Sequence, residues 1–518
     1  MKKIFTILLA GIAFSAQVMA VTPKEVCGQF DGDLNIGGTP YPNKSVYLLP
    51  GTVDNTVTFV LPDFKYNAGK LGNIVLPNIP IAENGMLTLE NNTLWIDSIS
   101  ERATITILNG LEDEGVVYNS IVTATEAQVL LSIEAPSLPE PIFVLFAGKA
   151  SSANNYLLPN GGFEGEWTNA EPAGWHSFNS ATGLMVDFIK NDYQFTQSTD
   201  VRPGSNGAHS ALLSSTMALG VKANGNCTNG QINAGSSTAN DSTGNYNFSD
   251  PANAGFNTPF CGRPDSIVFW AKYQPADRDA ANEVNRARLN AVITTNARYQ
   301  DPEEADKYGD VKIGTASLNY AATSEMGWQR LSVPFEYVAA NADKQPAFIL
   351  ATFSTNMVPG GGSSYSTGGN INKVNVLDSV YLDDVELVYN KQLAAFTKGG
   401  NAISFDGKVA VLSDNYCDDC AKFAAQANGV SANTFIAFDG AHRCIFIYVI
   451  ADDYAQTGAY SLYRVEFADS DTSDINPQQG IDNINDNPSS ETKKVLLNGQ
   501  LYIIRGNAWF TVSGTRVQ

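Results

Sequence analysis

The sequence predicts an all-β protein, and three observations support this fold class. Short runs in which apolar and polar residues alternate recur from residue 22 to residue 467, with clusters of turn-forming residues between them. Gly, Asn, Ser and Thr are frequent, which suits many short strands joined by turns. Charged residues make up only 16% of the chain, and hydrophobic residues, at 43%, are enough to build cores. A length of 518 residues predicts roughly three domains of about 150 residues each.

The first 20 residues predict an export signal. Lys2 and Lys3 form a basic start, residues 4–16 form an apolar core, and Val18-Met19-Ala20 is typical of a signal-peptide cleavage site. The apolar core is too short to span a bilayer comfortably, and no later segment is apolar enough to do so. We therefore leave residues 1–20 out of the fold and expect a protein that is secreted or held at the outer-membrane surface.

Two large β domains are expected after this signal. Residues 22–149 carry runs such as TVTFVLPDF and AQVLLSIE, at the spacing of a barrel or a sandwich. Residues 155–390 carry longer runs such as SIVFWAKY and SVYLDDVELVY. A Gly/Asn/Ser-rich stretch at residues 220–258 is too long for a connecting turn, which predicts a functional or mobile loop.

Three smaller segments complete the chain. Residues 391–467 predict a small β domain from runs such as CIFIYVIADD, with one helix expected at residues 418–428. Residues 468–494 are acidic and poor in apolar residues, which is typical of a flexible linker. Residues 495–518 predict a hairpin tail, because Asn498-Gly499 is a strong turn signal between two apolar strands.

The net charge narrows the choice of partners. The chain carries a formal net charge of −21. A phosphate backbone requires a basic footprint on the protein, so nucleic acid and anionic membrane surfaces are disfavoured. Neutral partners such as sugars remain compatible with this charge.

The first large segment resembles a known family. VTFVLPDF (Val57–Phe64) and LGNIVLPNIPI (Leu71–Ile81) resemble the calycin-like β-barrel domain of exported Bacteroidetes proteins. The resemblance covers most of residues 22–149 and implies a lipocalin-like barrel.

The middle segment resembles the putative carbohydrate-metabolism domain of the same bacteria, a jelly-roll sandwich similar to carbohydrate-binding modules. The motifs are NGGFEGEW (Asn160–Trp167), PAGW (Pro172–Trp175), HSALL (His209–Leu213), PFCGRPDSIVFWAKY (Pro259–Tyr273) and VYLDDVELVY (Val380–Tyr389). Five ordered motifs in residues 155–390 make this the strongest resemblance. It implies sugar-related work and names no reaction.

The end of the chain resembles the C-terminal tails of secreted and surface proteins in this group. The motifs are GIDNIN (Gly480–Asn485) and NGQLYIIRG (Asn498–Gly506). Such tails are linked to sorting through the outer membrane, which implies the export machinery as a partner. Residues 391–467 resemble no family that we recognise.

The jelly-roll resemblance also implies a structural Ca²⁺ ion between the first and last strands. Glu164 with Asp383 or Asp384 are the matching side chains, with backbone oxygens near Gly162. In a regular strand over residues 380–389 the odd-numbered residues share one face, where Asp383 is a lone carboxylate. Such a carboxylate is costly unless it is hydrogen-bonded or bound to a metal. The alternative is a hydrogen-bonded acid that closes the sandwich.

Aromatic residues are the candidates for sugar binding, because the C–H face of a sugar stacks on aromatic rings. The candidates are Trp175, His176, Trp270, Tyr273 and Trp328. Trp175 and His176 follow Pro-Ala-Gly and are expected at a turn, which favours them as ligand contacts. For each tryptophan alone, packing in the core is the competing interpretation.

The six cysteines all follow the signal, so disulfide bonds are compatible with export. Cys227 and Cys261 bracket the Gly/Asn/Ser-rich stretch and are candidates to join it. Cys417 and Cys420 form a C-x-x-C pair and are the other disulfide candidates. A zinc site would need Cys444 and His442 in addition to that pair.

No convincing catalytic set is present in the sequence. Glu164 and Glu166 are two residues apart and point the same way in an extended segment, whereas glycoside hydrolysis needs carboxylates facing each other across a bond. With three histidines and no His-Glu-x-x-His motif, serine- and metal-hydrolase signatures are absent.

The sequence therefore favours a non-catalytic carbohydrate-binding or surface glycan-handling protein. The first alternative is a glycoside hydrolase that draws Glu164, Asp187 or Asp383 from distant strands. The second is a surface adhesin that binds protein.

Overall fold

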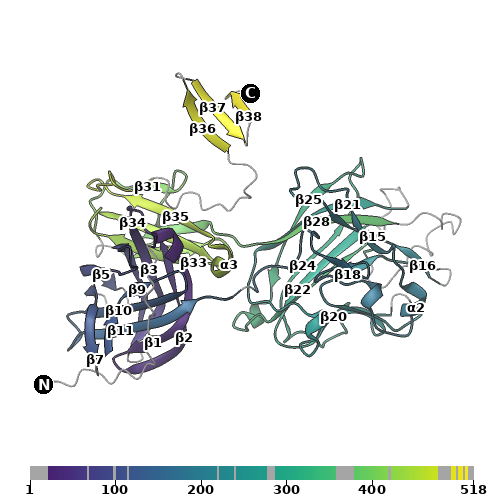
Figure 1. The fold of residues 1–518 in the computed structure, drawn as a ribbon, viewed down its shortest axis with the longest axis horizontal. Coiled ribbons are helices and arrows are strands. Elements are labelled where there is room, and N and C mark those ends of the chain that lie inside the picture. The colour runs from purple at the N-terminus through teal and green to yellow at the C-terminus, as the bar shows by residue number, and fades with distance from the viewer. Residues whose placement is uncertain are drawn as a thin grey trace. The chain divides into compact units, whose positions relative to one another are not determined.

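The computed structural model describes residues 21–66, 69–96, 101–113, 116–153, 155–218, 221–238, 241–276, 286–357, 378–417, 422–476, 492–497, 500–505 and 508–511. The predicted all-β class is confirmed, because strands dominate both units of the chain (Figure 1). Unit 1 comprises residues 1–153 and 390–518, and unit 2 comprises residues 154–389. Within the described residues, no helix is both long and apolar enough to cross a membrane. The predicted signal peptide and the Asn498-Gly499 turn lie outside the described residues.

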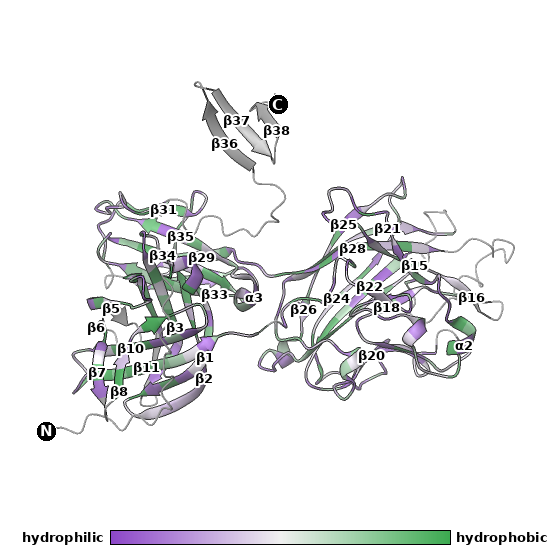
Figure 2. Cartoon of the chain, in the orientation of Figure 1, coloured by the Kyte–Doolittle hydropathy of each residue, from purple (hydrophilic) through white to green (hydrophobic). Residues whose placement is uncertain are grey.

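Unit 1 is built on a barrel-like antiparallel sheet in the order β4-β3-β2-β1-β11-β10-β6-β5, with β9 beside β10. The strands are β1 (Gly28–Ile36), β2 (Thr39–Pro50), β3 (Thr56–Tyr66), β4 (Gly69–Pro80), β5 (Leu89–Ile96), β6 (Glu101–Ile107), β9 (Ile121–Val122), β10 (Glu126–Glu134) and β11 (Ile142–Ala150). Helix α1 (Pro23–Val26) precedes them, and β7 (Asn109–Asp113) pairs with β8 (Val116–Asn119). Hydrophobic and hydrophilic residues are mixed along the strands of both units, as alternation requires (Figure 2).

The alternation sorts side chains to the two faces of this sheet. Leu48, Phe59 and Leu76 belong to one buried core on the inner face. Their neighbours Val60 and Val75 belong to a second buried core on the outer face. The inner face is filled by packed apolar side chains, which form the hydrophobic core inside the barrel-like sheet of unit 1.

Residues 393–476 cover that outer face. Their strands are β29 (Leu393–Lys398), β30 (Asn401–Ala402), β31 (Val409–Val411), β32 (Phe423–Ala427), β33 (Ala432–Asp439), β34 (Cys444–Ala451) and β35 (Tyr460–Glu466), with helix α3 at Tyr454–Thr457. They form the sheets β31-β35-β34-β33 and β30-β29-β32. All eight residues of β34 are buried, because one face packs on the barrel and the other on β29 and β32. Tyr448 on β34 is hydrogen-bonded to Thr58 on β3 at 2.9 Å.

The helix expected at residues 418–428 was wrong for its described part, which is strand β32. β32 pairs antiparallel with β29, and the rings of Phe423 and Phe396 stack with centroids 5.6 Å apart. Tertiary packing of Phe423 thus outweighs the helix propensity of the alanines. Downstream, β36 (Thr492–Leu497), β37 (Gln500–Arg505) and β38 (Ala508–Thr511) form an antiparallel sheet.

Unit 2 contains two five-stranded sheets. The first has the order β14 (Phe195–Ser198), β15 (Ser210–Ser214), β28 (Ser379–Val388), β21 (Ser266–Gln274), β25 (Gln329–Pro334), and the second β18 (Asn226–Thr228), β27 (Phe348–Ser354), β22 (Ala287–Thr294), β24 (Lys312–Tyr320), β26 (Glu336–Tyr337). Smaller elements are β12 (Trp167–Thr168), β13 (Glu171–Pro172), α2 (Val186–Ile189), β16 (Thr216–Ala218), β17 (Val221–Ala223), β19 (Gln231–Ala234), β20 (Asn245–Ser249) and β23 (Tyr299–Asp301). Phe269 of β21 packs on Phe353 of β27 with ring centroids 5.1 Å apart, so the two five-stranded sheets share a core.

A β-bulge in β28 changes the predicted faces of residues 380–389. Val268 pairs with Glu386 but Trp270 pairs with Asp383, so β28 has one extra residue here. Asp384 takes a left-handed φ of 44° at this point. Before the bulge the even-numbered Val380 and Leu382 are buried, and after it the odd-numbered Val385 and Leu387 are. The expectation of a single odd-numbered inner face was therefore wrong.

Candidate functional site

Trp175, the favoured ligand contact from the sequence, lies in the core of unit 2. Its exposed fraction is 0%, and its ring packs on Phe163 and Phe353 with centroids 5.5 and 5.9 Å apart. Its Nε1 donates to the Pro159 carbonyl at 3.1 Å. A sugar cannot reach a ring that is enclosed on this scale, so the expectation is corrected. A hydrogen-bonded, buried indole instead fixes the start of the sandwich.

His176 is half-buried and lies next to a carboxylate that the sequence analysis missed. Its Nδ1 is 3.4 Å from Glu171, and its ring is 4.5 Å from that of Phe256. Glu171 also accepts hydrogen bonds from the backbone N–H and the hydroxyl of Ser177, at 2.6 and 2.7 Å, and from Ser180. Burial opposes ionisation of Glu171, but the hydrogen bonds from His176 and the serines outweigh it and lower its pKa. His176 is thus held in place by the turn around Glu171.

Tyr273 was also expected to bind sugar and is instead a core residue. It lies on the inner face of β21 with an exposed fraction of 0%. Its hydroxyl donates to the Thr355 carbonyl at 3.3 Å, and its ring packs against Tyr320.

Trp270 and Trp328, by contrast, lie on the outer face of the β14-β15-β28-β21-β25 sheet, half-buried. We call this set of residues the aromatic face: Trp270, Lys272, Trp328, Arg330 and Tyr381. Strand register places Lys272 opposite Tyr381 and Trp270 opposite Arg330. Neighbouring strands are about 4.8 Å apart, so these side chains are in contact range. A turn closed by the Thr323 hydroxyl, which accepts from Gly327, delivers Trp328 to the edge of this set.

Lys272 binds the two rings at one end of the aromatic face. Its Nζ lies 4.0 Å from the ring centroid of Tyr381 and 5.9 Å from that of Trp328. It also forms an ion pair with Asp200, which accepts a hydrogen bond from Trp328 Nε1 at 3.1 Å. Burial alone would raise the pKa of Asp200, but the hydrogen bonds from Lys272 and Trp328 lower it on balance. The ion pair and the hydrogen bond thus hold Lys272 and Trp328 on the same carboxylate.

Arg202 covers the ring at the other end. Its guanidinium lies 5.3 Å from the Trp270 ring centroid, and its Nε donates to Asp384. Its backbone N–H donates to Asp383 at 3.1 Å. Asp383 has an exposed fraction of 0%, and burial raises its pKa to about 6. The bulge thus ties the acids at 383 and 384 to the loop that carries Arg202.

The residues proposed for Ca²⁺ can be tested against this arrangement. Glu164 and Asp384 both lie near Gly162, where an added Cβ would be 3.4 Å from Asp384 Oδ1 and 3.8 Å from Glu164 Cγ. However, Arg202 already neutralises Asp384, and Glu164 accepts from the backbone N–H and the Nδ1 of His209, at 2.8 and 3.1 Å. In the described part of the chain, no group of three or more His, Cys, Asp or Glu is placed to hold a metal. As arranged, these side chains do not fit an ion that wants six to eight oxygens.

The acids considered for hydrolysis each have a different environment. Asp187 is exposed on α2 and pairs with Lys190 at 2.7 Å. Glu164 pairs with His209, and Asp383 is enclosed in the bulge. None of these contacts joins one of the three acids to another, so no acid–base pair is assembled from them.

The cysteine predictions have mixed outcomes. Cys227 is a buried free thiol on β18, and Cys261 is exposed with its Sγ 3.4 Å from the Asn155 carbonyl, so the predicted Cys227–Cys261 bond is wrong. The reason is that Cys227 points into the core of unit 2, where burial also raises its pKa. Cys417 is disulfide-bonded, while Cys420 lies outside the described residues. A bonded Cys417 cannot serve the alternative zinc site, and Cys444 is buried in β34.

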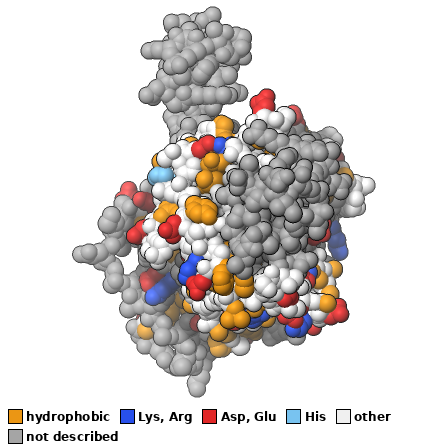
Figure 3. All heavy atoms as spheres, turned by 90° about the vertical axis from the view of Figure 1, so that its right-hand side faces the viewer, with side chains coloured by type: hydrophobic (Ala, Val, Ile, Leu, Met, Phe, Trp, Pro, Cys, Tyr) orange, Lys and Arg blue, Asp and Glu red, His pale blue; other side chains and the backbone are white. Residues whose placement is uncertain are grey.

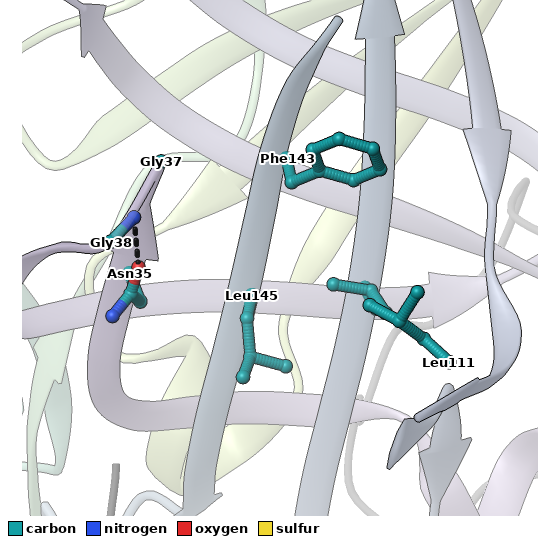
Figure 4. A pocket seen from close by; sticks show the side chains of 7 residues that line it. Asn35, Gly37, Gly38, Leu111, Phe143 and Leu145 are labelled. Atoms are coloured by element: carbon teal, nitrogen blue, oxygen red, sulfur yellow. Dashed lines mark hydrogen bonds between the residues drawn. The ribbon is translucent and has the colours of Figure 1, made fainter. Parts of the chain in front are cut away.

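Two other places on the described surface, a hollow in unit 1 and exposed apolar residues in unit 2, are weaker candidates for a binding site. A hollow on the barrel-like sheet has about 10 Å³ open to the centre of a water molecule, and Figure 4 shows its lining, including Asn35, Phe143 and Leu145. That is room for about one water and too small for a sugar. At the end of unit 2 near α2, Leu184 and Phe188 are exposed, and Figure 3 shows hydrophobic side chains there scattered among acidic and basic ones.

Comparison with known proteins gives little. No family model and no curated protein matches the chain. Among solved structures, an arabinose-bound α-L-arabinofuranosidase aligns with a TM-score of 0.22 and 13% identity, over 46% of this chain and 27% of that one. A putative outer membrane protein from Bacteroides fragilis aligns with a TM-score of 0.18 and 16% identity, over 24% of this chain and 52% of that one.

A cyclase from Fischerella sp. aligns with a TM-score of 0.22 and 9% identity, over 46% of this chain and 96% of its own. The chain thus spans about a quarter of the arabinofuranosidase and half of the outer membrane protein. At these TM-scores none of the three supports an inference about function.

Proposed function

We propose that this is an exported glycan-binding protein without catalytic activity, and that the aromatic face of unit 2 is where it binds sugar. The observation that carries the proposal is the ladder of Trp270, Tyr381 and Trp328 on one outer sheet face, each half-buried and each beside a charged side chain. The core residue Trp175 instead packs on the rings of Phe163 and Phe353.

This composition suits a sugar for two reasons. An aromatic ring offers the apolar surface on which the C–H face of a pyranose stacks, and the charged groups around it can exchange hydrogen bonds with hydroxyls. Both kinds of group are fixed by their neighbours: Lys272 and Trp328 share Asp200, and Arg202 is held by Asp384. A pre-organised surface loses less entropy when it binds.

Export and surface location belong to the same proposal, and rest on the N-terminal signal and the C-terminal tail in the sequence. The structural Ca²⁺ ion that the jelly-roll resemblance implies would have to compete with Arg202 for Asp384. Glycoside hydrolysis is less favoured than binding, because Glu164, Asp187 and Asp383 occupy separate environments.

Affinity electrophoresis of the full chain against a panel of plant and host polysaccharides tests the proposal. We expect retardation by at least one polymer, and Trp328→Ala should weaken it about tenfold, since stacking residues at a binding surface contribute on the order of 1–2 kcal/mol. Phe188→Ala is the matched control, because Phe188 is an exposed aromatic on α2, outside the aromatic face. Failure to bind any polysaccharide, or equal loss from both variants, would sink the proposal.

A further inference from the structure

We propose that the aromatic face recognises a carboxylated glycan, one that contains uronic acid residues, and that Arg330 is the group that binds the sugar carboxylate. This rests on the proposed function and names the ligand class of the same site.

Arg330 differs from Lys272, the other basic residue of the aromatic face, and from Arg202, which lies over the Trp270 ring of that face. Lys272 is paired with Asp200, and Arg202 is paired with Asp384. Arg330 is exposed on β25, and no ion pair or hydrogen bond involving its side chain is found among the described residues, although Glu386 is near enough to interact with its charge. It is thus the cation at this face that no carboxylate holds in a direct ion pair.

Arg330 lies beside an aromatic ring, that of Trp270, against which a sugar can pack. Its partner across the β21–β25 pair is Trp270. Directly opposed residues on an antiparallel sheet have Cβ atoms about 4.5–5.5 Å apart, which is close to the width of one sugar ring. A pyranose that packs against the side of Trp270 not covered by Arg202 would therefore present its exocyclic carboxylate to the guanidinium of Arg330, which can bind both oxygens.

The charge around the aromatic face is compatible with an anionic ligand, whereas the average charge of the chain is not. The whole chain has 32 basic and 53 acidic residues, so its average field repels polyanions. The charged residues at this sheet face are three basic ones, Arg202, Lys272 and Arg330, and three acidic ones, Asp200, Asp384 and Glu386. The local balance is neutral, and the acids at 200 and 384 are already bound to their own cations. Burial and the charge of Asp384 raise the pKa of Glu386, and the charges of Arg202 and Arg330 oppose this rise.

The test compares a polyuronate with its own neutral derivative. Polygalacturonate and fully methyl-esterified polygalacturonate have the same backbone and differ at the carboxyl group, which the ester leaves uncharged and capped by a methyl group. Alginate and hyaluronan are further acidic polymers for this comparison, and the neutral polymers of the panel are further uncharged ones. The full chain should bind at least one acidic polymer about tenfold or more tightly than its neutral counterpart at low salt, and this preference should shrink as salt is raised.

Variants separate recognition by Arg330 from general attraction of polyanions. Arg330→Ala should reduce acidic-polymer affinity about tenfold, and Arg330→Lys should recover part of it, since the ammonium keeps the charge and loses the bidentate geometry. Arg298→Ala is the matched control: it removes the same charge from a part-exposed arginine that lies over Tyr246 and Phe248. Equal effects of the alanine variants at 330 and 298 would overturn the inference.

The two proposals fail in different ways. If the chain binds neutral polymers as tightly as acidic ones, or if Arg330→Ala has no effect, the carboxylate inference falls and sugar binding stands. If no polymer of either kind is bound, the proposed function itself falls.

Discussion

The barrel-like sheet of unit 1 and the β14-β15-β28-β21-β25 sheet of unit 2 use their outer faces in opposite ways. In unit 1 the outward residues Leu49, Val60 and Val75 are aliphatic and pack against β33, β34 and β35. In unit 2 the outward residues Trp270, Lys272 and Tyr381 are amphipathic and half-buried.

The residue types on the outward face of a strand indicate whether that face is covered by another layer or lies at the surface. Both strand sets alternate, but an outward row of aliphatic residues indicates that another layer of the chain covers it. An outward row that mixes aromatic and charged residues satisfies its own polar groups and remains available at the surface. The outer face in unit 1 therefore contributes stability, and the outer face in unit 2 is the one for which we propose recognition.

The largest effect is expected from a substitution that creates a cavity between β34 and the barrel-like sheet of unit 1. Phe446 on β34 has an exposed fraction of 1% and lies in the core that joins β34 to the barrel-like sheet. Phe446→Ala should lower the free energy of unfolding by about 3–5 kcal/mol, because it removes a buried ring and leaves a cavity. Urea unfolding followed by circular dichroism measures this change.

The control is Val430→Ala, at an exposed position of unit 1, which should change the free energy of unfolding by less than about 0.5 kcal/mol. Polysaccharide affinity should be unchanged by either substitution. A loss of affinity in Phe446→Ala at a temperature where the chain is still folded contradicts the assignment.

The next largest effect is expected at Trp270. Trp270→Ala removes the ring under Arg202 and beside Arg330. We expect polysaccharide affinity to fall about thirtyfold, corresponding to about 2 kcal/mol for an aromatic residue at the centre of a binding surface. Isothermal titration calorimetry measures the affinity, and a melting temperature within a few degrees of the unmodified chain shows that the fold persists. Unchanged affinity would remove Trp270 from the site.

A smaller, pH-dependent effect is expected at His442 in unit 1. Its Nδ1 is 2.7 Å from Asp439 and its Nε2 is 3.1 Å from Asp474, while Asn78 of β4 donates to Asp439 at 2.8 Å. Burial alone would lower the pKa of His442, but the two carboxylates outweigh it and raise the pKa. A raised folded-state pKa gives stability that is complete below the ordinary value of about 6.5 and is lost as pH rises through the folded-state value.

We expect His442→Gln to cost about 1–2 kcal/mol at pH 5.5 and much less at pH 8.5, as measured by urea unfolding. Arg443 and Asp471 flank the cluster, and hydrogen bonds from Ser473 lower the pKa of Asp471. His209→Gln serves as a control, because His209 is a more exposed histidine in unit 2. A cost for His442→Gln that is the same at both pH values would show that the ion pairs contribute nothing.

The smallest effect is expected from chelation. Because Arg202 binds Asp384 and His209 binds Glu164, EDTA should lower the melting temperature by less than about 2 °C. Differential scanning calorimetry with and without added Ca²⁺ measures it. A drop of several degrees that Ca²⁺ reverses would establish the metal ion implied by the jelly-roll resemblance and would place Arg202 elsewhere in the bound state.

The sequence predicted what depends on periodicity and missed what depends on tertiary contacts. The alternation in residues 57–64 and 266–273 identifies strands, because each has a buried face. It did not locate the bulge at Asp383, since a bulge is defined by the partner strand. It placed Trp175 at a turn, and the turn is present, since the Trp175 N–H donates to the Pro172 carbonyl. The local sequence does not show whether the ring after such a turn lies at the surface or in the core, and the ring of Trp175 is buried.

Other misses have the same origin. Glu171 carries no motif; only the return of Ser177 and Ser180 to its carboxylate reveals its role. Cys227 and Cys261 bracket a long stretch, but spacing along the chain says nothing about the direction in which each sulfur points. Trp270 and Trp328 were identified as candidates singly, and strand register was needed to bring them together with Tyr381.

Strand β34, buried on both sides, also bears on the order in which the molecule is made. The apolar outer row on β2, β3 and β4 is synthesised long before the residues that cover it, with all of unit 2 in between. Unit 2 is continuous in sequence and can complete its core as soon as its own last strand arrives. Unit 1 must wait for the chain beyond residue 444, so its folding is expected to be the slower step and its exposed row the point at which an unfinished chain aggregates.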